Sequence, residues 1–102
     1  MSTTVTVSIG RNVGDEPMSD ERWYAFREAT HEVLDARGTA IHFEGTGTGY
    51  FEGNIEQSFT LVATVENVVG LYHALATLAG EFDQDSIALT TGATSFPGTK
   101  EA

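Results

Sequence analysis

Residues 41–65, IHFEGTGTGYFEGNIEQSFTLVATV, decide the fold, and they include four glycines between Gly45 and Gly53. Written with a period of two, the first half of this stretch separates into two sets. The odd set is apolar or glycine: Ile41, Phe43, Gly45, Gly47, Gly49 and Phe51. The even set is polar: His42, Glu44, Thr46, Thr48, Tyr50 and Glu52. This alternation predicts a strand, and the glycines on its inner face remove bulk where a helix approaches closely.

A nucleotide-binding glycine loop is excluded by the spacing of these residues. The G-x-G-x-x-G fingerprint needs a glycine at its third fixed position and a helix directly after it. Tyr50 occupies that position when the motif begins at Gly45, and Glu52 occupies it when the motif begins at Gly47. No helical pattern follows in either register.

Residues 55–65 predict a second strand, joined to the first by a hairpin. Gly53 and Asn54 suggest a two-residue loop, but such a loop would set apolar positions opposite polar ones. A three-residue loop, from Glu52 to Asn54, sets apolar or glycine positions of one strand opposite apolar positions of the other. The cross-strand pairs are then Phe51 with Ile55, Gly47 with Phe59, and Gly45 with Leu61. In this register the aromatic ring of Phe59 covers Gly47.

The flanking sequence predicts two more strands and two helices. Residues 4–10 alternate strictly between polar and apolar side chains, as a half-buried strand does. Ser19 is a helix N-cap, and Met18 and Trp23 stand at the positions of a hydrophobic staple. That helix ends at Gly38. Apolar residues at helical spacing predict a second helix over 67–79 that stops at Gly80, and residues 86–93 predict the last strand.

The element order is therefore β-α-β-β-α-β, and every element has one apolar face. The economical arrangement is a ferredoxin-like α+β sandwich, a four-stranded antiparallel sheet in the order 4-1-3-2 with both helices on one face. Residues 1–96 form this single domain, and residues 97–102 are expected to be a flexible C-terminal tail.

A resemblance accompanies this fold. The segment SIGR closes the first strand, a glycine-rich loop follows, and MSDERWYAF opens the helix. This arrangement resembles small ferredoxin-like domains of unknown function from bacteria and their phages. The resemblance implies the fold and a phage accessory protein, and it brings no activity and no site residues with it.

The charge balance restricts the partners of the chain. Fifteen Asp and Glu against five Lys and Arg give a net charge of −10. Direct binding to nucleic acid or to anionic lipid depends on clustered basic residues, so neither is expected. Basic proteins remain possible partners. The chain has no cysteine, no signal peptide pattern and no apolar run long enough to span a bilayer, and a cytoplasmic location follows as the expectation.

Candidate site residues are few. Arg11 and Asn12 follow the first strand beside glycines and are candidates for anion binding, although an arginine in such a position more often pairs with a nearby carboxylate such as Asp15. His42 and Glu44 share the polar face of their predicted strand, but a metal site would need a third strong ligand. No metal ion and no cofactor are therefore expected.

The outer face of the sheet is the remaining candidate surface. It is rich in threonine, and flat faces of this kind suit sheet-on-sheet contacts. We expect a homodimer with three residues near the centre of its interface: Tyr50, Thr60 and Val62. The sequence favours a non-enzymatic protein-binding or accessory protein. Two alternatives stay open: an acidic inhibitor that mimics nucleic acid and binds a basic host protein, and a small enzyme that uses the open sheet face.

Overall fold

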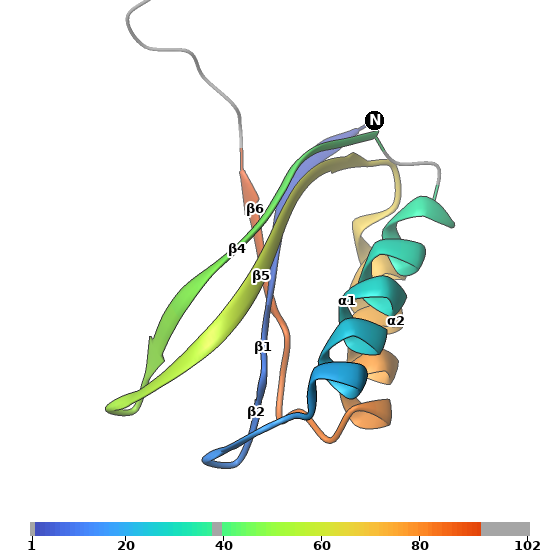
Figure 1. Ribbon diagram of the computed structural model, residues 1–102. Coiled ribbons are helices and arrows are strands. Elements are labelled where there is room, and N and C mark those ends of the chain that lie inside the picture. The colour runs from blue at the N-terminus through green and yellow to red at the C-terminus, as the bar shows by residue number, and fades with distance from the viewer. Residues whose placement is uncertain (1, 38–39, 93–102) are drawn as a thin grey trace, which may run out of the picture.

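The computed structural model describes residues 2–37 and 40–92, and it confirms the α+β, ferredoxin-like arrangement (Figure 1). The sheet is antiparallel and four-stranded, in the order β4-β5-β1-β6. Its strands are β1 (Thr3–Gly10), β4 (Ala40–Phe51), β5 (Asn54–Val65) and β6 (Ala88–Gly92). The two helices, α1 (Asp20–Asp35) and α2 (Val68–Glu81), lie together on one face of the sheet.

Two of the predicted boundaries fall on residues that the structure does not describe. The predicted helix stop at Gly38 and the predicted C-terminal tail, 97–102, lie outside the described residues. Helix α1 has Ala36 as its C-cap residue.

The core lies between the sheet and the helices. Strand β1 is central, and alternate residues Val5, Val7 and Ile9 are almost completely buried. Strand β5 contributes Phe59, Leu61, Ala63 and Val65 to the same layer. The helices cover this layer with their apolar stripes: Trp23, Phe26 and Leu34 from α1, and Leu71, Leu75, Leu78 and Ala79 from α2.

The start of α1 is built as the sequence predicts. The Ser19 hydroxyl accepts a hydrogen bond from the backbone N–H of Arg22 at 3.2 Å. This bond satisfies one of the free N–H groups of the first turn. Met18 and Trp23 are both buried, which fits a staple across the helix start. Before the helix, the loop forms a small second sheet of β2 (Asn12–Val13) and β3 (Glu16–Pro17).

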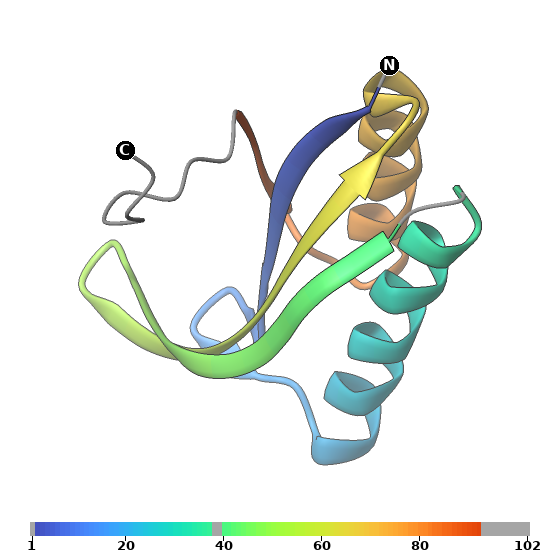
Figure 2. The ribbon, with the colours of Figure 1, turned by 90° about the horizontal axis from the view of Figure 1, so that it is seen from above.

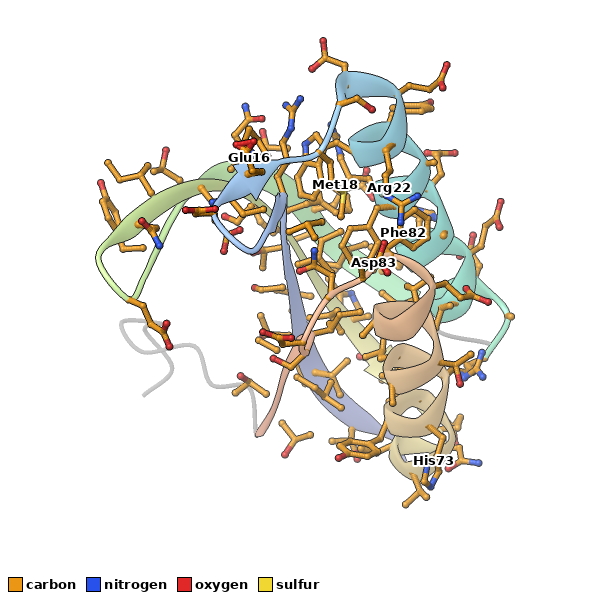
Figure 3. The ribbon with its side chains drawn as sticks, turned by 90° about the horizontal axis from the view of Figure 1, so that it is seen from below. Glu16, Met18, Arg22, His73, Phe82 and Asp83 are labelled. Atoms are coloured by element: carbon orange, nitrogen blue, oxygen red, sulfur yellow. The ribbon has the colours of Figure 1, made fainter. Side chains whose placement is uncertain are left out.

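Helix α2 continues past Gly80, so the predicted stop there was wrong. The helix reaches Glu81 because contacts with α1 fix its last turn. The Arg22 guanidinium lies 5.0 Å from the centre of the Phe82 ring and donates hydrogen bonds to the Glu81 carbonyl and to the Asp83 carboxylate. Figure 3 shows Arg22 directed at Phe82 and Asp83 from the neighbouring helix. These tertiary contacts outweigh the weak helix propensity of one glycine.

The predicted register of the β4–β5 hairpin was also wrong. The hairpin has a two-residue turn, with Phe51 opposite Asn54. Both turn residues have positive φ, 49° at Glu52 and 82° at Gly53, as a tight hairpin turn that matches the strand twist requires. A two-residue turn does conflict with the apolar–polar alternation of β4, but an irregularity elsewhere in the strand removes this conflict. A register shift between Ile41 and Phe43 inserts one extra residue in β4, which is a β-bulge.

Compared with the prediction, the bulge reverses which residues of β4 face the helices over most of the strand. Ile41 still faces the helices, opposite Ala63, but beyond the bulge Thr46 lies opposite Phe59, and Gly47 lies opposite Ser58. Gly47 therefore lies on the outer face, and a Cβ added to it would meet nothing within 4 Å. The expectation that the ring of Phe59 covers Gly47 was wrong. A ring does cover a glycine in this strand, because a Cβ on Gly45 would lie 3.1 Å from Cζ of Phe43.

The far end of this hairpin extends away from the rest of the fold. In Figures 1 and 2 the two long strands curve away from both helices toward the Glu52–Gly53 turn. We call residues 47–57 the arm. The side chains of Tyr50 and Ile55, paired across the arm, are 78% and 66% exposed.

Candidate functional site

The outer sheet face is a broad surface that neither helix covers. Both helices lie on the opposite side of the sheet (Figure 2). The ladder pairs define its members, most of which are small or bear a hydroxyl group: Thr4, Thr6 and Ser8 of β1, Ser58, Thr60, Val62 and Thr64 of β5, Ala88 and Thr90 of β6, and Phe43, Gly45, Gly47 and Gly49 of β4. Together with His42 they form what we call the outer face.

Polar side chains of neighbouring strands contact one another on this face. The hydroxyls of Ser8 and Thr60 are hydrogen-bonded at 2.8 Å, and Nε2 of His42 is hydrogen-bonded to the Thr64 hydroxyl at 2.7 Å. Phe43 is 58% exposed and is the largest apolar side chain of the face. Sequence analysis missed Phe43 because its odd position placed it with the core. The bulge that moves it outward leaves no sequence signal apart from the parity conflict itself.

The predicted interface residues are not all on this face. Thr60 and Val62 are neighbours on it and are half-buried. Tyr50 pairs with Ile55, whose side chains lie on the other face of the arm. The placement of Tyr50 beside Thr60 and Val62 was therefore wrong, and the reason is the same bulge.

Charge is nearly absent from the outer face. Among the described residues, the ladder places one carboxylate on that side of the sheet, Glu56, at the margin where β1 ends. Its Oε2 accepts a hydrogen bond from the Asn12 backbone N–H at 2.9 Å, and its carboxyl group lies against Gly10. The face thus contrasts with a chain whose net charge is −10.

Arg11 holds the end of β1 in place. Its Nε donates to the Met18 carbonyl at 2.8 Å, Nη2 pairs with the Asp20 carboxylate at 2.7 Å, and Nη1 donates to the Gln57 side chain. The partner is thus Asp20 rather than Asp15. Three of the five N–H groups of the guanidinium are directed to groups of the chain itself, and 17% of the side chain is exposed.

A cleft of about 390 Å³ separates the β2–β3 hairpin from the arm. Its lining brings the two predicted anion-binding residues together with acidic and apolar ones: Arg11, Asn12, Asp15, Pro17, Thr48, Ile55, Glu56 and Gln57. Because the charge of Arg11 is paired with Asp20, the carboxylates of Asp15 and Glu56 dominate the cleft. A cationic ligand with an apolar part matches this lining better than an anion does.

His42 and Glu44 lie on opposite faces of the sheet, which corrects the shared polar face that the sequence predicts. Glu44 pairs with Leu61, on the helix side, and its carboxylate lies 3.1 Å from Nε2 of His31 on α1. Nδ1 of the same histidine lies 3.3 Å from Asp35. The described residues contain no group of three or more His, Cys, Asp and Glu that could hold a metal ion. Within the same residues, no helix is long and apolar enough to cross a membrane.

Comparisons with known proteins define the fold and no sequence family. No protein-family model matches the sequence, and no curated protein matches it. Among solved structures, the chain is similar to an unknown protein from Galdieria sulphuraria, with 17% identity and a TM-score of 0.49 over 88% of this chain. It spans 47% of that protein.

The chain is also similar to a phage SAM lyase in its apo state. The two are 15% identical, the TM-score is 0.51, and the match covers 88% of this chain and 78% of the lyase. At this identity the likeness shows a shared fold. The resemblance to ferredoxin-like phage domains is thus supported at the level of fold, and no sequence family supports it.

Proposed function

We propose that the chain is a protein-binding accessory protein that works as a homodimer through its outer face. One observation carries this proposal: the outer face is almost free of charge, in a chain with a net charge of −10. Two copies of so acidic a chain repel each other wherever carboxylates face one another. The outer face is where two copies can approach most closely without this repulsion.

The shape and chemistry of the face suit a second copy. Side chains of threonine, serine, alanine and glycine allow two sheets to pack about 10 Å apart. Phe43 supplies exposed apolar area at one side of the face. Strand β4 lies at the edge of the sheet, and three of its glycines leave the middle of that edge without charged side chains to block association. A two-fold dimer, the commonest oligomer, would cover both the face and the edge.

A charge placed at Thr60 tests the proposal. Thr60→Lys puts two ammonium groups into the contact, and sedimentation velocity should show a monomer where the wild type has twice its 10.9 kDa mass. Thr77→Lys adds the same charge on the exposed side of α2 and should leave the dimer intact. Circular dichroism checks that both variants keep the fold. A wild type that remains at 10.9 kDa at high concentration contradicts the proposal, as does a dimer that tolerates Thr60→Lys.

A second candidate function is a lyase reaction on SAM. It is supported by the likeness of fold to the phage SAM lyase and by the cleft at the base of the arm. The sulfonium of SAM is a cation bonded to a methyl group and two methylene carbons, and the cleft combines the carboxylates of Asp15 and Glu56 with Ile55 and Pro17. The opposite charges attract in a partly enclosed cleft more strongly than in open water.

Calorimetry with two matched ligands tests this candidate. SAM should bind more tightly than S-adenosylhomocysteine, which lacks the sulfonium charge, and Asp15→Asn should reduce that difference. Chromatography of SAM incubated with the protein then shows whether SAM is consumed. Equal affinity for the two ligands, or no binding of either, would remove the candidate.

A further inference from the structure

Arg27 differs from the other arginines of the chain. The sequence has four arginines, and its fifth basic residue is Lys100, outside the described residues. Arg11 pairs with Asp20, Arg22 pairs with Asp83, and Arg37 donates to the Val33 carbonyl at 3.0 Å. Arg27 has no hydrogen-bond or ion-pair partner within the described residues, and its Nε is buried without one.

The position of Arg27 explains how its guanidinium is held. It lies on α1, half-buried, with its Cζ 4.7 Å from the centre of the Phe59 ring on β5. At this distance the guanidinium and the ring make a cation–π contact, which holds the side chain near β5. Nε is buried whereas Arg27 as a whole is only half-buried, so a ligand from solvent would have to bind through the Nη groups. Phe59 itself is buried, so the contact is part of the boundary between core and solvent.

A second hydrogen-bond donor lies on the same side of the sheet. Thr46 is the cross-strand partner of Phe59, so its side chain faces the helices beside the ring, and it is exposed. One helical turn beyond Arg27, the side chain of His31 is held between Asp35 and Glu44. The nearest acidic side chain of β4 is thereby directed to the histidine rather than to the guanidinium.

A buried donor without a partner costs about 1–3 kcal/mol. A shortage of acidic residues does not explain why Arg27 has no partner, since the chain has fifteen Asp and Glu for five Lys and Arg. A guanidinium that contacts an aromatic ring and has no protein partner for its Nη groups can bind a planar anion through two parallel N–H···O bonds.

We infer that Arg27, which contacts Phe59 on the same side of the sheet as Thr46, is a binding site for the carboxylate of a small organic acid. One guanidinium and one hydroxyl match a singly charged, planar carboxylate. A phosphate dianion would bring a second negative charge into an acidic chain with no second free cation beside Arg27 among the described residues. The site lies on the helix side of the sheet, opposite the outer face. Ligand binding at Arg27 can therefore be tested independently of dimer formation.

Nuclear magnetic resonance of the arginine Nε–H groups tests the site directly. Protein labelled with ¹⁵N is titrated with acetate, with phosphate and with chloride at constant ionic strength. We expect acetate to produce a saturable shift of the Arg27 Nε–H signal, assigned with Arg27→Lys, and of the Thr46 amide signal. Phosphate should bind more weakly, and chloride should not saturate.

Two variants separate binding from a structural role. Thr46→Val should weaken acetate binding on the order of fivefold, the effect of one lost hydrogen bond, without changing the melting temperature by more than a few degrees. Arg27→Gln should abolish the saturable shift. A shift that is linear, that chloride reproduces, or that all four arginines share would overturn the inference and leave Arg27 with a purely structural contact to Phe59. Tighter binding of phosphate than of acetate would also overturn it.

Discussion

Substitution of Gly47 distinguishes the observed register of the β4–β5 hairpin from the one that the sequence favours. In the structure, a Cβ at this position meets nothing within 4 Å, so valine fits without displacing a neighbour. Glycine weakens a strand interior, and strand propensities span about 1 kcal/mol. Gly47→Val should therefore stabilise the fold by about 0.5–1 kcal/mol. For a domain of this size that is a rise in melting temperature of about 2–8 °C.

The alternative register predicts the opposite sign. With a three-residue loop, the valine methyls would lie under Phe59 and cost about 1–3 kcal/mol through overpacking. Thermal unfolding followed by circular dichroism, at a concentration where the mass does not change, decides between the two. Gly45→Val is the matched control, because its Cβ would lie 3.1 Å from the Phe43 ring and should gain less stability than Gly47→Val. A melting temperature lowered by Gly47→Val would refute the observed register.

Three further substitutions test other parts of the fold. Glu52→Asn should stabilise the protein by about 0.5–1 kcal/mol, because Glu52 has a φ of 49° and asparagine tolerates that region better; a loss of stability would contradict the two-residue turn. Leu61→Ala should cost about 2–5 kcal/mol in urea unfolding, since Leu61 is fully buried; a cost below 1 kcal/mol would argue against its place in the core. Arg22→Ala should cost about 1 kcal/mol, since its contacts to Phe82 and Asp83 are partly exposed; no change in stability would show that they do not hold the end of α2.

The order and type of the main elements could be predicted because local signals agree with the packing. Strict alternation in β1 matches the burial of Val5, Val7 and Ile9. Ser19 caps α1 as its side chain chemistry suggests. Each element has one apolar face, and only a few layered arrangements bury all of these faces together.

The register of β4 could not be predicted from local signals. The residues on both sides of the turn fit a loop of two or three residues, and the choice depends on where an extra residue enters the strand. The structure places it between Ile41 and Phe43, near the helix-covered end. With the bulge there, Glu44 lies on the helix side, and its carboxylate is 3.1 Å from Nε2 of His31. The bulge also places Phe43 on the outer face and Tyr50 away from it.

The candidate surfaces were accordingly predicted only in part. Thr60 and Val62 lie on β5, whose alternation is unbroken, and their face was right. Arg11 was identified as the arginine of interest because it follows a strand beside glycines, yet its N–H groups mostly bind the chain itself. Arg27 gave no signal in the sequence, because an arginine on a helix is ordinary until its neighbours are known.

Distances between two copies test the outer-face dimer most directly. The chain has no cysteine, so a single spin label can be placed at Thr90→Cys on the outer face or at Ala76→Cys on the exposed side of α2. Pulsed electron–electron double resonance then measures the separation between the labels of two copies. The account predicts an intermolecular distance for both labels, and a clearly shorter one for the label at position 90. A shorter distance at position 76, or no intermolecular distance at either position, would contradict association through the outer face.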